Sequence, residues 1–216
     1  MKIFKTLTLA TIMIVATSLM IACSEKDKTE VKTHNDLAMT NTNASISEAT
    51  NNQAETTTQE NVETQVFTIK SVGTPAAGKA VDFTWEANGK EVSFAEFTKG
   101  KVVLINFWGT WCPPCRREIP DLVKLHNDLK DKDVVMMGIA LERNPSQAFQ
   151  KVTNFAKSQN MTYMQFLPQS NDIMKAYGGI NAVPTTFIID KSGKISETIV
   201  GMRDYNTFLA AVKKAL

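Results

Sequence analysis

From position 66 to the C-terminus, apolar and polar positions follow the periods of strands and helices. Two continuous apolar runs of strand length, KVVLINFW (101–108) and DVVMMGIAL (133–141), are typical of strands that are buried on both faces. Apolar residues at helical spacing predict a helix from about Cys112 to Leu129. Shorter strands are predicted at 66–72, 80–85, 90–94, 162–168, 184–190 and 194–201, and further helices at 94–100, 144–160, 171–179 and 205–216.

This order of elements predicts an α/β fold with a mixed central sheet and helices on both faces. About 150 residues are enough to enclose one hydrophobic core. Local signals mark several boundaries. The Asn88-Gly89 pair predicts a hairpin turn, Asn144 followed by Pro145 suits the start of a helix, and Gly178 predicts a helix end.

The first 65 residues have a different character. Two lysines, an uncharged stretch over 6–22 and then Cys23 form the pattern of a secretory signal peptide. The stretch is shorter than the roughly 20 apolar residues that a membrane-spanning helix needs, although an uncleaved N-terminal anchor helix is the alternative. Residues 24–65 contain no Gly, Pro, Cys or aromatic residue, and we expect them to be disordered. The predicted organisation is a signal peptide over 1–22, an anchor cysteine and linker over 23–65, and one domain over 66–216.

Charge excludes one class of partner. The whole chain has 24 basic and 22 acidic residues, and positions 66–216 hold 19 basic and 14 acidic ones. This excess is mild and is scattered along the sequence, so no nucleic-acid partner is expected. No phosphate-binding or nucleotide-binding motif is present.

Two of the three cysteines, Cys112 and Cys115, stand at the start of a predicted helix. Unpaired backbone N–H groups and the positive end of the helix dipole favour a thiolate there. We expect Cys112 to be the attacking sulfur and Cys115 to resolve the mixed disulfide, with a disulfide between them in the oxidised state. Pro113 and Pro114 suit the first helical turn. Trp111 is expected to shield one side of the pair.

Glu118 follows Cys115 by three residues and therefore shares its helix face. Its carboxyl could exchange a proton with the Cys115 thiol, or it could simply be a glutamate that the helix dipole favours in the first turns. These residues alone leave the two roles open.

Other candidate residues receive structural roles. Arg116 and Arg117 are expected on a solvated helix face, His126 at a packing or surface position, and Met136 and Met137 in the core of a strand rather than as copper ligands.

The third cysteine has a separate explanation. The segment LMIAC, which ends at Cys23, resembles the lipobox of bacterial lipoproteins, although Met20 departs from the more usual leucine. The resemblance implies that Cys23 is lipidated, becomes the first residue of the mature chain and anchors it to a membrane.

The segments FWGTWCPPCRREIP (107–120) and VPTTFIIDKSGK (183–194) together resemble the TlpA/ResA/CcmG group of thioredoxin-like thiol-disulfide oxidoreductases. The similarity covers roughly residues 80–216. It implies a thioredoxin-like fold with an N-terminal strand extension and a central insertion within 144–168. It also implies a cis bond between Val183 and Pro184, in a loop that contacts the cysteine pair. Substrate binding would then involve Val183, Pro184, Thr185 and Trp111.

The resemblance also bears on individual residues. An acid at the position of Glu118 is typical of these reductases, and Asn106 stands where thioredoxin has a buried aspartate. Pro120 matches a proline that kinks the same helix. Val81 departs from the proline that is usual in the family, which affects the entry strand rather than the chemistry.

The expected function is an exported, membrane-tethered thiol-disulfide oxidoreductase on the extracytoplasmic face of a bacterial membrane. It would reduce protein disulfides, among which the heme-binding cysteines of apocytochromes c are one candidate, and would receive electrons from a membrane thiol transporter of the DsbD or CcdA type. Neither a cofactor nor a metal is expected. The alternative is a copper-binding chaperone of the Sco type. Such proteins use a longer cysteine spacing and a histidine near the cis-proline loop, whereas His34 and His126 lie far from that loop in the sequence.

Overall fold

The computed structural model describes residues 64–216. The predicted signal peptide, Cys23 and nearly all of the predicted linker lie outside the described residues. No helix in the described part is long and apolar enough to cross a membrane.

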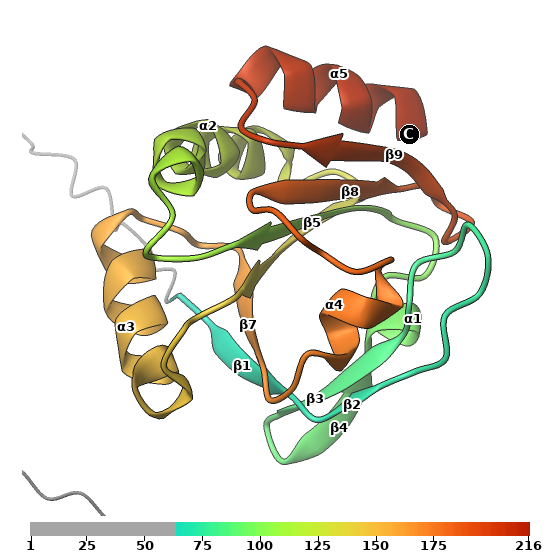
Figure 1. Ribbon diagram of the computed structural model, residues 1–216. Coiled ribbons are helices and arrows are strands. Elements are labelled where there is room, and N and C mark those ends of the chain that lie inside the picture. Colours follow the sequence, from blue (N-terminus) through green and yellow to red (C-terminus); the bar gives the residue numbers. More distant parts are fainter. Residues whose placement is uncertain (1–63) are drawn as a thin grey trace, which may run out of the picture. The chain divides into compact units, whose positions relative to one another are not determined.

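A six-stranded mixed sheet forms the centre of the domain (Figure 1). Its spatial order is β1 (Val66–Ile69), β7 (Met164–Pro168), β6 (Val134–Ala140), β5 (Val102–Trp108), β8 (Thr185–Ile189) and β9 (Ile195–Val200). The first four strands in this order are parallel, and β8 pairs antiparallel with both β5 and β9. The predicted α/β fold with a mixed sheet is confirmed.

Side chains of the central strand β5 alternate between two hydrophobic clusters, because successive strand residues point to opposite faces. Leu104 and Trp108 join the cluster that contains buried residues of α2 (Pro113–Leu129), α3 (Pro145–Ser158) and α5 (Tyr205–Ala215). Ile105 and Phe107 join the cluster on the other face, which includes residues from β3 (Phe83–Ala87) and α4 (Asp172–Ala176). Helices therefore lie on both faces, as predicted, and every residue of β5 is buried.

A small second sheet packs on the same face of the central sheet as α4. It consists of β2 (Ser71–Val72), β3 (Phe83–Ala87) and β4 (Lys90–Ser93), and the adjoining helices are α1 (Phe94–Phe97) and α4 (Asp172–Ala176). The predicted hairpin turn at Asn88 and Gly89 joins β3 to β4, and both residues have positive φ. With β1, these strands form the N-terminal part of the domain.

One predicted strand was wrong in its extent. The stretch 66–72 divides into β1 in the large sheet and β2 in the small sheet. The division falls at Lys70, whose backbone N–H donates to the Thr84 carbonyl at 2.7 Å, and whose side chain pairs with Glu86. The chain therefore leaves the large sheet at Lys70 and pairs with β3.

Helix boundaries follow the predicted signals closely. Asn144 is the N-cap of α3 and accepts a hydrogen bond from the Ser146 N–H at 3.2 Å. Gly178 follows α4 with φ of 85°, as the predicted helix end requires. The segment 144–168, in which we expected the insertion, forms α3 and β7, and β7 lies between β6 and β1 in the sheet.

A close contact between β6 and β7 requires glycine at position 138. The Trp108 indole N–H donates to the amide oxygen of Gln165 at 3.0 Å, and both side chains are fully buried. A Cβ atom at Gly138 would overlap that amide oxygen and would lie 2.9 Å from the indole nitrogen. β6 can therefore lie against this buried hydrogen bond only because residue 138 has no side chain.

Gly138→Ala should lower the free energy of unfolding by about 1–3 kcal/mol, because the new methyl group must disrupt a buried hydrogen bond. Equilibrium unfolding in denaturant measures this loss. Gln165→Ala removes the overlapped amide, so the double variant should lose less stability than the two single losses added together. Strictly additive losses would contradict this account.

Candidate active site

The cysteine pair lies where β5 ends and α2 begins. β5 ends at Trp108, and the Cys112 N–H closes the following turn by donating to the Gly109 carbonyl at 3.1 Å. Cys112 is the N-cap residue of α2, and a disulfide joins it to Cys115, with 5.3 Å between the two Cα atoms. Cys112 is 2% exposed, and Cys115 is fully buried. Cys112 is therefore the more exposed residue of the pair.

The surroundings of the Cys112 sulfur favour negative charge. Its Sγ accepts the backbone N–H of Cys115 at 3.2 Å, and it stands at the positive end of the α2 dipole. In the reduced protein both interactions stabilise the thiolate relative to the thiol.

The loop before β8 contacts this sulfur. The Val183–Pro184 bond is cis, as the family resemblance implied, and the Val183 carbonyl oxygen lies 3.5 Å from Sγ of Cys112. The loop is held on both sides: the Gly201 N–H donates to the Pro184 carbonyl at 2.8 Å, and the Thr185 hydroxyl donates to the Ala182 carbonyl at 2.8 Å. The structure thus brings Val183, Pro184 and Thr185 to the cysteine pair.

Glu118 is buried beneath the first turns of α2, with 1% of its surface exposed. Its carboxylate accepts hydrogen bonds from the Asn106 amide at 2.9 Å and from the Arg203 backbone N–H at 3.3 Å. Burial outweighs these bonds and raises the pKa of Glu118 from 4.5 to about 7. The carboxyl therefore changes its ionisation near neutral pH.

Asn106 links this carboxyl to the neighbouring strand. Its amide also donates to the Thr186 hydroxyl on β8 at 2.9 Å, and its own oxygen, which is buried, has no hydrogen-bond partner. Asn106, Glu118 and Arg203 come from β5, α2 and the segment after β9. Three separate elements therefore fix the position of the carboxyl.

Trp111 forms the exposed rim of the site, with 40% of its surface exposed. Its indole N–H donates to the Leu141 carbonyl at 2.7 Å, and the Arg143 guanidinium lies 4.1 Å from its ring centre. A Cβ atom at Gly109 would lie 2.6 Å from the indole nitrogen, so this position of the ring requires glycine there. Glu142 accepts hydrogen bonds from the Thr110 N–H at 2.8 Å and the Thr110 hydroxyl at 2.9 Å.

Sequence reasoning did not identify Glu142, Arg143 or Arg203 as residues of this site. A signal for the first two was present, because they follow the predicted strand 133–141 and the carboxyl ends of parallel strands meet at one edge of a sheet. Arg203 reaches Glu118 through its backbone N–H, which no side-chain pattern reveals.

The remaining candidates have packing roles. Met136 and Met137 are buried in the two clusters, as expected. The His126 ring packs against Tyr163 with 5.6 Å between ring centres, and burial lowers the pKa of its imidazole. Arg116 is exposed and lies 5.8 Å from the Phe155 ring centre. No group of three His, Cys, Asp or Glu residues that could hold a metal occurs within 64–216.

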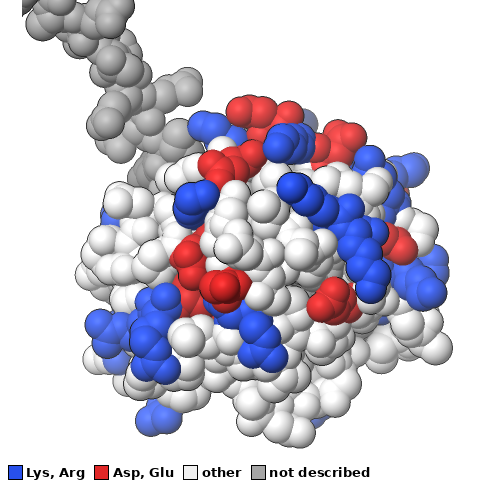
Figure 2. All heavy atoms as spheres, turned by 90° about the horizontal axis from the view of Figure 1, so that it is seen from above, with Lys and Arg blue, Asp and Glu red and all other residues white. Residues whose placement is uncertain are grey.

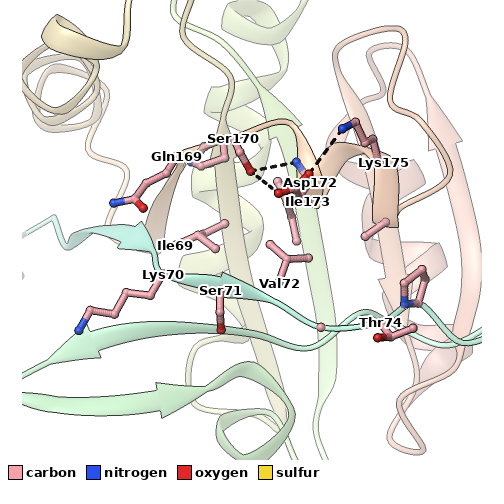
Figure 3. A pocket seen from close by; sticks show the side chains of 14 residues that line it. Ile69, Lys70, Ser71, Val72, Thr74, Gln169, Ser170, Asp172, Ile173 and Lys175 are labelled. Carbon is pink, nitrogen blue, oxygen red and sulfur yellow. Dashed lines mark hydrogen bonds and ion pairs between the residues drawn. The ribbon is translucent and has the colours of Figure 1, made fainter.

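A cavity of about 680 Å³ opens elsewhere, between the segment around β2 and the segment around α4 (Figure 3). Asp172 at its wall accepts a hydrogen bond from the Ser170 hydroxyl and pairs with Lys175. None of the predicted site residues lines this cavity, so it is separate from the cysteine pair.

Comparison with known proteins agrees with this geometry. The Redoxin family matches residues 71–214. Thiol-disulfide oxidoreductase ResA of Bacillus thuringiensis subsp. konkukian is 38% identical over 116 residues, which are 54% of this chain and 64% of the relative. Thioredoxin-like protein YneN of Bacillus subtilis is 33% identical over 138 residues, 63% of this chain and 78% of that protein. The match to ResA thus covers slightly less than two thirds of the relative's length.

Two solved structures share the fold. A thiol:disulfide interchange protein of the thioredoxin family from Chlorobium tepidum is 34% identical, with a TM-score of 0.55 over 68% of this chain and 98% of its own. The exposed lipoprotein thioredoxin Etrx1 from Streptococcus pneumoniae is 26% identical, with a TM-score of 0.52 over 62% and 98% of the two chains. The fold, the cysteine pair and the match over 71–214 together show that this chain belongs to the Redoxin family and has a thioredoxin-like α/β fold.

Proposed function

We propose that this protein is a thiol-disulfide oxidoreductase that reduces disulfides of other proteins through Cys112 and Cys115. The observation that carries the proposal is the position of the Cys112 sulfur: it caps α2, accepts the Cys115 N–H and lies against the Val183 carbonyl. Relatives named as thiol-disulfide oxidoreductases or thiol:disulfide interchange proteins support the same activity.

The reaction begins with the reduced pair. The Cys112 thiolate attacks one sulfur of a substrate disulfide, the substrate S–S bond breaks, and its second sulfur leaves as a thiolate that takes up a proton. The Cys115 thiol then loses its proton and attacks the Cys112 sulfur. The Cys112–Cys115 disulfide forms, the first substrate sulfur leaves, and two electrons have passed to the substrate.

Substrate would bind across the rim of the site. Trp111, which precedes Cys112 in the chain, offers an exposed apolar ring, and the loop Val183–Thr185 supplies backbone groups beside the Cys112 sulfur. The heme-binding cysteines of apocytochromes c are one candidate substrate, and a membrane thiol transporter of the DsbD or CcdA type is the proposed source of electrons.

Cys112→Ser should abolish reduction of a protein disulfide, because it removes the nucleophile. Cys115→Ser should instead accumulate a mixed disulfide with the substrate, because Cys115 releases it. Non-reducing electrophoresis with a disulfide-bonded protein detects the trapped complex, and a thiol-release assay measures the activity.

Reductase activity that survives Cys112→Ser would disprove this mechanism. The direction of electron flow has its own measurement, the reduction potential of the pair. A value near about −270 mV is expected for a reductase, whereas a value near about −120 mV would make the protein an oxidant.

We further propose that Glu118 exchanges a proton with Cys115. The two residues are one helical turn apart, and the carboxyl is buried, with a pKa of about 7. A glutamate that served only the helix dipole could remain exposed to solvent. A buried carboxyl that titrates near neutral pH can take up a proton from a neighbouring thiol and return it.

Glu118→Gln should change the pH dependence of stability. Between about pH 4.5 and 7 the folded oxidised protein keeps a proton on Glu118 that the unfolded chain has lost, so the free energy of unfolding falls as pH rises. The glutamine variant should lack this fall and should gain about 3 kcal/mol at pH 8 relative to the unsubstituted protein. Denaturant unfolding across this pH range measures it. Glu91→Gln, at an exposed position on β4, is the control and should keep the original slope.

The proposed proton exchange between Glu118 and Cys115 needs a second measurement. Its readout must be one that the burial of Glu118 alone would not change. In reduced protein with Cys112→Ser, adding Glu118→Gln should lower the pKa of the Cys115 thiol, because a neighbouring carboxylate that disfavours the thiolate has been removed. Alkylation rates of Cys115 against pH report the change. An unchanged thiol titration would remove Glu118 from the mechanism.

Location forms a separate proposal: the chain is exported and is held at the extracytoplasmic face of a bacterial membrane through a lipid on Cys23. Its support is the signal-peptide pattern and the LMIAC segment. Each buried methylene of an acyl chain contributes about 0.8 kcal/mol to membrane binding, so more than one chain gives a stable anchor.

Mass spectrometry of the chain isolated from bacterial membranes should find a mature N-terminus at Cys23 that carries acyl groups. Cys23→Ser should abolish both the acylation and the cleavage, whereas the neighbouring control Ser24→Ala should preserve both. An intact, unmodified N-terminus in the unsubstituted chain would support an anchor helix instead.

A further inference from the structure

The charge excess of the domain gathers at one end of the molecule. We call this the distal end, because it lies at the end of the central sheet opposite Cys112. The parts that form it are α1 with the loop to β5, the turn after α2, the β8–β9 turn, the segment around position 79 and the last turn of α5. Nine lysines lie on these parts: Lys79, Lys99, Lys101, Lys130, Lys132, Lys191, Lys194, Lys213 and Lys214.

Contacts between these parts show that they are neighbours. The backbone of Lys79 pairs with that of Lys194 in an isolated antiparallel β-bridge, and the Lys79 ammonium donates to the Ser192 carbonyl at 3.3 Å. The Lys191 ammonium lies 3.6 Å from the Asp133 carboxylate in the turn after α2. Figure 1 shows the C-terminus of α5 at the same end as the turn between β8 and β9. Segments far apart in the sequence therefore form one continuous surface.

Few acidic residues offset these lysines. The same parts carry four acidic side chains: Glu96, Asp131, Asp133 and Asp190. The rest of 66–216 has ten basic and ten acidic residues, so the whole excess of positive charge belongs to the distal end. In the view of Figure 2, blue side chains outnumber red ones along the right-hand edge, the side on which Figure 1 places the C-terminus.

The type of cation also differs between the two ends. All nine basic residues of the distal end are lysines, whereas Arg116, Arg143 and Arg203 stand in or beside the candidate active site. Arginine suits bidentate recognition of a defined partner group. Lysine is a hydrated point charge on a flexible stem, and all nine except the half-buried Lys101 are exposed. This composition fits diffuse attraction to a broad anionic surface.

A cavity of about 260 Å³ opens within this surface. Its charged lining residues are four lysines and one aspartate: Lys79, Lys99, Lys101, Lys191 and Asp190. The four lysines outnumber the single aspartate, so the lining of this opening has a net positive charge that favours an anionic group such as a phosphate.

We propose that the distal end docks on a membrane surface that displays anionic phospholipid headgroups. Each lysine near such a surface strengthens binding roughly fivefold. Helix α2 runs 17 residues from the cysteine pair to this end, a length of about 25 Å. Docking would therefore turn Cys112 away from the membrane, toward partner proteins. The proposal rests on the charge layout and is independent of the redox activity.

Lysine footprinting on the full chain tests this orientation. The chain is mixed with vesicles of phosphatidylglycerol and phosphatidylcholine in equal parts, or of phosphatidylcholine alone, and is treated with an amine-reactive reagent before mass spectrometry. Distal-end lysines should be protected only on the anionic vesicles, while the exposed Lys90, Lys151 and Lys157 elsewhere should stay reactive. Protection should weaken at high salt, because the Debye length falls from about 10 Å at 0.1 M to 3 Å at 1 M.

A charge-reversal variant with Lys99→Glu, Lys191→Glu and Lys194→Glu should lose this protection and bind anionic vesicles more than about tenfold more weakly. The matched control carries Lys90→Glu, Lys151→Glu and Lys157→Glu, with the same net charge, and should keep both. Three results would overturn the proposal: equal losses in the two variants, equal protection on both kinds of vesicle, or protection by inorganic phosphate alone. Because the readout is the headgroup dependence of lysine reactivity, it is distinct from tests of acylation at Cys23 and of reductase activity.

Discussion

The antiparallel pairing of β5 with β8 is the constraint on which the candidate active site depends. β5 leads directly to Cys112, and β8 begins directly after Pro184, with Phe107 opposite Thr185 in the ladder. This register brings the Val183 carbonyl to the Cys112 sulfur, although 71 positions separate the two residues in the chain. A slip of one residue would turn the side chains of β8 to the opposite faces of the sheet. The backbone ladder, rather than any contact at the site, therefore sets the geometry of the sulfur and its neighbouring loop.

The same strands create the environment of Glu118. β5 places Asn106 under α2, β8 places Thr186 beside it, and the segment after β9 supplies the Arg203 N–H. These groups satisfy the carboxylate without making it as stable as it would be in water, so its pKa stays near 7. Ionisable groups with such shifted pKa values are concentrated at functional sites. This carboxyl, whose burial is energetically unfavourable, therefore lies next to the residues that carry the proposed chemistry.

Local patterns in the sequence were enough to predict most elements and the start of the site. The apolar runs of β5 and β6, the helical spacing of α2 and the cap at Asn144 all lie within short windows, where the period of apolar residues decides the element. The extent of β1 could not be predicted in this way. Its end at Lys70 depends on a hydrogen bond to Thr84, which belongs to another strand of the small sheet.

The sequence by itself determined which atoms can carry sulfur chemistry, because two cysteines at a helix start are a local feature with a local electrostatic cause. It also identified Glu118 as a candidate, through helical spacing together with the family resemblance. Only the tertiary structure decided that this carboxyl is buried and that Arg203, 85 positions away, donates to it. Likewise, the lysines are scattered along the chain but gather at the distal end. Burial and surface charge are sums over segments that are distant in sequence, and no local period records them.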